Sequence, residues 1–111
     1  MSGDELRRLS ADLTQAGEQA KQRADVAVRK TAFDIQGDAQ QLAPVDTGNL
    51  RNSIIVATAP GSARAVITPT ANYAIYVELG TSRMAAKPFL GPATDRWEPA
   101  FHEAMRQVMD T

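Results

Sequence analysis

One short string in the sequence has the residue types for a known kind of catalysis. Val45-Asp46-Thr47-Gly48 contains the Asp-Thr-Gly triplet of aspartic proteases, in which two such aspartates share one proton. That triplet normally follows a strand in an all-β chain, whereas here it follows a long helical segment. A structural role is favoured, with Asp46 accepting backbone N–H bonds across a turn and Gly48 supplying a positive φ. A retroviral-type dimeric aspartic protease stays the alternative hypothesis, and peptidase activity that disappears in Asp46→Asn would establish it.

The other reactive side chains form no pattern of catalysis or metal binding. The 111 residues include no cysteine and a single histidine, His102, which excludes a disulfide framework, a thiolate site and a histidine-ligated metal centre. Glu78 stands alone among apolar neighbours, with no second carboxylate at a spacing suited to acid–base work. The sequence therefore predicts no enzyme activity, no cofactor and no small-molecule substrate.

Charge and hydropathy exclude two classes of partner. The net charge is −1, which argues against a protein that binds nucleic acid through bulk charge. No apolar run reaches the roughly 18 residues of a membrane span, and the acidic N-terminus is unlike a signal peptide. We therefore expect a soluble protein of a reducing compartment, with no membrane partner and no sequence-specific nucleic acid. Residues 47–93 carry a net +3 and the two flanks −2 each, a polarity that would orient stacked subunits unless it is only solvated surface.

The elements that hold these residues begin with an unusually long helix. Apolar residues recur in steps of three and four over residues 4–42, Ser2 or Asp4 can cap the start, and Pro44 ends the pattern. About 38 helical residues span about 57 Å, whereas a compact domain of this size has a radius of gyration of about 13 Å. The helix therefore either breaks near Gly17 or projects its N-terminal half, which would expose an interface of three leucines, Leu6, Leu9 and Leu13.

The rest of the chain alternates strands and short helices. Two β-rich runs, 53–59 and 63–68, flank Pro60-Gly61-Ser62 and predict a hairpin. Next come a short helix capped by Asn72 and ended by Gly80, an exposed loop, and a closing helix that Pro99 should kink or restart. The fold class is α+β, a small antiparallel sheet of two to four strands packed by the two long helices. A single domain is expected, divided into a long helix at 1–42, a β-rich region at 43–93 and a C-terminal helix at 94–111.

Three strings in this order resemble one known family. They are Ala43-Pro44-Val45-Asp46-Thr47-Gly48-Asn49-Leu50-Arg51-Asn52-Ser53-Ile54, then Tyr73-Ala74-Ile75-Tyr76-Val77-Glu78-Leu79-Gly80-Thr81, then Lys87-Pro88-Phe89-Leu90-Gly91-Pro92-Ala93. The combination is similar to the HK-type gene-product-ten family of tailed bacteriophages, described as tail-component or head–tail joining (neck) proteins. The resemblance implies a structural minor virion protein of a long-tailed phage or prophage, made in the host cytoplasm and acting in tail completion at the head–tail junction. A generic coiled-coil adaptor, which would tolerate scrambling of residues 73–93, is a further rival.

The resemblance also implies roles for particular residues. Subunits would assemble into a ring whose faces meet the head-closure and tail-terminator proteins. Arg51 and Glu78 are expected to pair, and the mobile loop 81–87 would order on a neighbouring ring. The full set of structural and interface candidates is Asp46, Gly48, Arg51, Tyr73, Tyr76, Glu78, Gly80, Arg83, Lys87, Phe89, Leu6, Leu9 and Leu13.

Overall fold

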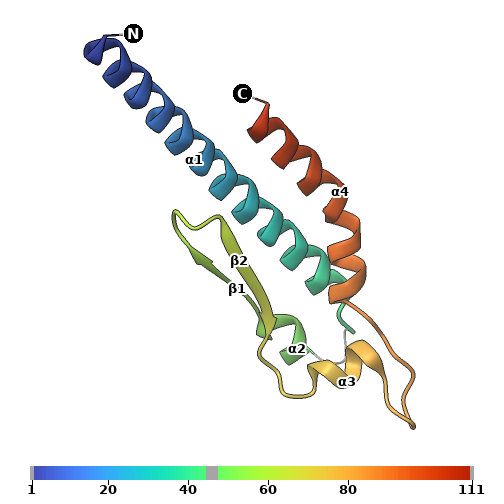
Figure 1. Cartoon of the computed structure of the whole chain (residues 1–111). Helices are drawn as coiled ribbons and strands as arrows, with labels where there is room; N and C mark the ends of the chain where they lie inside the picture. Colours follow the sequence, from blue (N-terminus) through green and yellow to red (C-terminus); the bar gives the residue numbers. More distant parts are fainter. Residues whose placement is uncertain (1, 45–47, 111) are drawn as a thin grey trace.

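A computed structural model of the chain describes residues 2–44 and 48–110. Along the chain its elements are α1 (Gly3–Leu42), α2 (Gly48–Ser53), β1 (Ile54–Ala59), β2 (Arg64–Pro69), α3 (Ala74–Leu79) and α4 (Leu90–Met109). The predicted α+β class is confirmed, with a long N-terminal helix, an antiparallel strand pair and a C-terminal helix. The molecule measures 73 × 22 × 21 Å, because α1 continues well past the elements packed along its C-terminal half (Figure 1).

Helix α1 is continuous, so the alternative in which it breaks near Gly17 is wrong. The Ser2 side chain accepts a hydrogen bond from the Glu5 N–H and caps the first turn. Gly17 has no atom within 4 Å of the place where a Cβ would lie, so nothing packs there that would bend the helix back. The helix accommodates Gly17, like Gly37, at a cost of about 1 kcal/mol relative to alanine.

The strands form one two-stranded antiparallel hairpin. Val56 pairs with Ile67 and Ala57 with Val66, so successive side chains alternate between the two faces. One face packs towards α1, while the other leaves Ile55 47% and Val66 44% exposed. Gly61 closes the turn with a φ of 83°, as the Pro-Gly-Ser string predicts.

The core lies at one end of the molecule, where α2, α3 and the start of α4 meet the C-terminal half of α1 (Figure 1). Phe89, Leu50 and Ile54 are its largest fully buried side chains. Ile35 and Ala39 contribute the apolar face of α1. Most of the hydrophobic stabilisation is therefore concentrated around the three strings that the sequence singles out.

Helix α4 runs back along α1 and is tied to it by one polar cluster. The indole N–H of Trp97 donates to Asp38 Oδ2 at 2.6 Å, and Arg96 lies 3.2 Å from the same oxygen. The helix continues through Pro99, so the alternative in which the proline restarts it is wrong. Trp97 on one side of the proline and buried Val108 on the other hold α4 in place, which offsets the lost N–H donor.

Helix α3 is short and differs from the prediction at its start. The N-cap residue is Tyr73 and makes no side-chain capping bond, so the predicted Asn72 cap is wrong. The chain arrives there through a backbone turn, in which the Ala74 N–H bonds to the Ala71 carbonyl. At the other end Gly80 has a φ of 78°, which confirms the predicted glycine stop.

Candidate assembly surface

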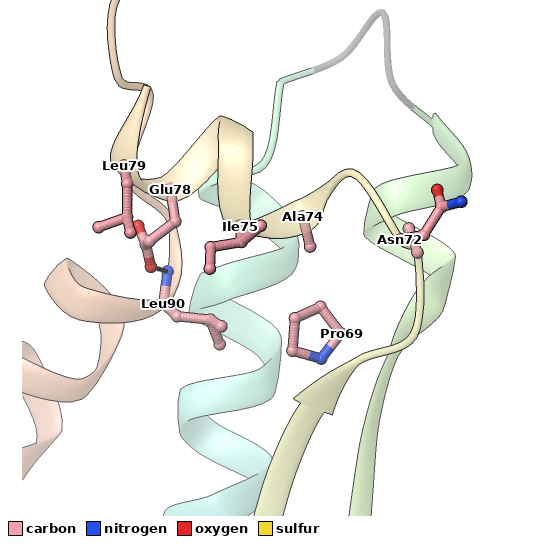
Figure 2. Close-up of a pocket in the computed structure, with 8 residues that line it drawn as sticks. Pro69, Asn72, Ala74, Ile75, Glu78, Leu79 and Leu90 are labelled. Atoms are coloured by element: carbon pink, nitrogen blue, oxygen red, sulfur yellow. Dashed lines mark hydrogen bonds between the residues drawn. The ribbon is translucent and has the colours of Figure 1, made fainter. Parts of the chain in front are cut away.

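The carboxylate of Glu78 joins two of the three strings. It accepts hydrogen bonds from the backbone N–H groups of Phe89 and Leu90 at 2.9 Å each, and of Gly91 at 3.0 Å. Figure 2 shows the Glu78 and Leu90 bond at the side of a shallow pocket. The predicted pair between Arg51 and Glu78 is therefore wrong, because Glu78 bonds to the start of α4 instead.

This arrangement supplies α4 with a cap from a different helix. The residue at the N-cap position, Phe89, has no side chain that can accept a bond, and the first N–H groups of any helix lack partners within the helix. An anionic acceptor there satisfies them and also interacts favourably with the positive end of the helix dipole. Glu78 thus fixes both the position and the direction of α4 relative to α3.

The first string is described only in part. Asp46, together with its neighbours at 45 and 47, lies outside the described residues, and Gly48 is the first residue of α2. The predicted roles of Asp46 and of a positive φ at Gly48 stay predictions. Arg51 is half-buried, and within the described part of the chain its Nε is buried without a hydrogen-bond partner.

The loop after α3 folds back on the glycine that ends the helix. The Lys87 N–H bonds to the Val77 carbonyl at 2.8 Å, and Thr81 and Met84 close a turn. A Cβ on Gly80 would lie 2.7 Å from the Ala86 nitrogen, so this close backbone approach requires glycine. The side chains along the outside of the loop are exposed, including Arg83, and mobility of this segment stays a prediction.

Helix α3, which precedes this loop, exposes an apolar surface. Tyr73 packs against the core, whereas Tyr76 is 56% exposed together with Ile75 and Leu79. A pocket of about 370 Å³ opens between α3 and the end of the hairpin (Figure 2). Its lining residues are Pro69, Ala71, Asn72, Ala74, Ile75, Glu78, Leu79 and Leu90. The carboxylate of Glu78 is already bonded to backbone, so the pocket presents mainly apolar walls.

The predicted leucines lie at the opposite end of the molecule. Every described residue from 2 to 19 is exposed, and Leu6, Leu9 and Leu13 are 56%, 44% and 65% exposed. No other element covers this part of α1 (Figure 1). The predicted projection of the N-terminal half of α1, with its leucines uncovered, is thus confirmed, and it separates these residues from the α3 surface by most of the molecule's length.

Within residues 2–44 and 48–110, no group of three or more histidine, cysteine or acidic side chains is placed to hold a metal ion. None of the described helices is both long enough and apolar enough to cross a membrane. Nothing in this part of the chain supports the aspartic protease: the sheet there has two strands, and the aspartate of the triplet is not among the described residues.

Sequence reasoning missed two contacts that hold these surfaces on the fold. One is the hydrogen bond from the Trp97 indole to Asp38. A buried indole N–H needs an acceptor, so the single tryptophan of the sequence could have indicated a bond of this kind. The other is the bond from Gln36 Nε2 to the Ile54 carbonyl at 2.8 Å, which ties α1 to the first residue of β1. No spacing in the sequence points to this second bond.

The fold and its exposed surfaces define an elongated protein with a compact base and an uncovered helical arm. Residues 7–80 match a family model described as "Bacteriophage HK97-gp10, putative tail-component". The chain belongs to this HK97 gp10 family, and is thus a phage tail protein with a place in the virion. The match covers α1 from residue 7 onward, α2, the hairpin and α3, and it ends before the third string. No curated protein and no solved structure gives a significant match.

Proposed function

We propose that the protein is a structural, non-enzymatic tail-completion subunit that assembles into a ring at the head–tail junction. One observation carries this proposal: the N-terminal half of α1 exposes Leu6, Leu9 and Leu13 and has no cover from its own chain. A row of solvent-facing leucines on a continuous helix is typical of an interface. Family membership supports the tail as the location of that interface.

In the proposed ring, the arm formed by residues 3–19 lies against the next subunit. Ala16 and Ala20 follow the leucines on the same side of α1, and their small side chains would let two backbones approach closely. Each subunit would give one arm and receive another, which is the head-to-tail contact that closes a ring.

The two faces of the ring would meet the head-closure and tail-terminator proteins. The loop at 81–87 supports this, because it presents exposed Arg83 and Lys87 and follows the apolar residues of α3. Cationic side chains at the edge of an apolar patch suit a partner with acidic groups around an apolar centre. We expect amide exchange across the loop to slow when the ring binds its neighbour.

The experiment uses a phage or prophage that lacks its own copy of this gene and is complemented from a plasmid. The Leu6→Ser/Leu13→Ser variant should fold normally, fail to form rings, and leave separate heads and tails in electron micrographs. Met109→Ser, at an 80% exposed residue of α4, is the control and should complete virions. Normal rings and virion yield from the double variant would overturn the proposal. Joined particles with tails of the wrong length would place the protein elsewhere in the tail.

A further inference from the structure

A second pattern on α1 involves charged residues that the leucine arm does not use. Eight positions follow one another in alternating steps of four and three residues, which places them on a single face of the helix. They are Glu5, Leu9, Asp12, Ala16, Gln19, Arg23, Val26 and Lys30. All eight are exposed. We call these positions the α1 stripe.

The α1 stripe of one copy is complementary to the α1 stripe of a second copy that runs in the opposite direction. Its members are placed symmetrically about the peptide bond between residues 17 and 18, so a second copy running in the opposite direction meets it position by position. Acid then faces base twice and apolar faces apolar: Glu5 opposite Lys30, Asp12 opposite Arg23, and Leu9 opposite Val26. The smallest pair, Ala16 opposite Gln19, lies next to the centre.

We infer that two copies of this chain pair through antiparallel α1 helices, with a two-fold axis near Gly17. A two-fold contact uses the same surface on both subunits, and each pair in it occurs twice. Both copies therefore contribute both halves of the stripe, over about 39 Å of helix at about 1.5 Å per residue. The stripe residues next to the axis are Ala16 and Gln19, while Gly17 lies more than a third of a turn away from the stripe.

The shape of the surface around the α1 stripe agrees with a second copy of α1 as its occupant. A groove of about 650 Å³ lies between α1 and α4, and the stripe residues from 19 to 30 form one side of it. Its other side consists of Ala104, Gln107 and Val108, which carry no charge. The segment of the second copy around Leu9 would occupy this groove. The three residues of α4 that line the groove would place no charge beside the acids that flank Leu9.

The charges of the stripe are largely available. Within the described residues, the side chains of Glu5, Asp12 and Arg23 make no ion pair, while Lys30 bonds to Asp34 at 2.7 Å and lies 5.6 Å from the centroid of the Trp97 ring. Pairing with a second copy would give each of the three an opposite charge. Leu6 and Leu13 lie about a quarter turn to one side of the stripe, whereas Leu9 and Ala16 belong both to the stripe and to the proposed ring contact.

The test is the mass of the purified chain in solution at about 200 µM, where a contact of micromolar affinity is saturated. In the Leu6→Ser/Leu13→Ser background, which removes the proposed ring contact, the otherwise unaltered chain should have twice the 12.0 kDa mass of one subunit. Arg23→Glu and Asp12→Lys should each weaken the dimer at least tenfold, because either change places like charges opposite each other at two symmetric positions. The matched control is Arg7→Glu, the same charge reversal on the opposite face of α1, and it should leave the dimer intact.

Mixing the two variants makes the test decisive. A heterodimer of Arg23→Glu with Asp12→Lys restores opposite charges at both positions, so an equimolar mixture should recover the dimer. In a parallel, staggered pairing Arg23 would instead meet Glu5 and Asp12 would meet Lys30. The double variant Asp12→Lys/Arg23→Glu separates the two arrangements, because it restores opposite charges in the antiparallel dimer and places like charges together in the parallel one. Monomeric unaltered protein, equal effects of the control, or absence of rescue would each overturn the inference. The readout is the mass of the free protein, so a failure of the ring proposal leaves it unaffected.

Discussion

The two halves of α1 belong to the same uninterrupted helix but have opposite surroundings. From residue 20 onward the helix packs against the hairpin and α4, buries Ile35 and Ala39, and bonds through Asp38 to Trp97. From residue 2 to 19 every described side chain is exposed. Helix propensity alone gives an isolated helix little stability in water. The packed half of α1 therefore stabilises the helical conformation that continues into residues 2–19. The comparison separates residues that hold the fold from residues available to a second chain.

The largest difference should come from the same substitution in the two regions. Leu50 is fully buried, so Leu50→Ala removes core packing and should lower the free energy of unfolding by about 3 kcal/mol. Leu13 is 65% exposed, so Leu13→Ala should change it by less than about 0.5 kcal/mol. Urea unfolding at low protein concentration measures both values. Comparable losses in the two variants would mean that the arm is part of the core.

A smaller contrast is expected for two glutamates. Glu78→Ala removes the acceptor of three backbone N–H groups at the start of α4 and should cost about 2 kcal/mol. Glu18→Ala, at an exposed position of the arm, is the control and should be close to neutral. Thermal unfolding followed by circular dichroism compares the two, and a neutral Glu78→Ala would remove this cap from the account.

The two regions also contain glycines with opposite requirements. Gly80→Ala forces a residue with a Cβ to a φ of 78° and into the Ala86 backbone, and should destabilise by about 1–2 kcal/mol. Gly17→Ala has open space and helical geometry, and should stabilise by up to about 1 kcal/mol. Opposite shifts of the unfolding temperature are expected, and shifts of the same sign would contradict the description of one of these sites.

Local patterns in the sequence predict much of this fold. The period of α1, its stop before Pro44, the hairpin and the glycine end of α3 each depend on neighbouring residues, and all four are confirmed. The errors concern contacts between distant segments. Opposite charge suggests Arg51 as the partner of Glu78, but the backbone of residues 89–91 arrives closer and needs an acceptor. Such a choice depends on tertiary positions that no local spacing encodes.

The same reasoning explains the continuity at Gly17 and Pro99. Both residues destabilise a helix, and the residue type alone indicates how large that cost is. The packing that offsets the cost depends on the fold and cannot be read from the sequence. At Pro99 that packing comes from Trp97 and Val108 on either side. At Gly17 nothing competes with the helical conformation, since residues 2–19 have no internal surface on which to fold back.

The central claim, that residues 3–16 contribute to assembly and not to the fold, is tested most directly by deleting residues 1–16. The truncated chain should keep its circular dichroism per remaining residue and unfold within a few degrees of the full chain, because its core is intact. Size-exclusion chromatography with light scattering should show that it no longer assembles. A folded chain that does not assemble is the result we predict. Loss of folding, or normal assembly by the truncated chain, would contradict the account.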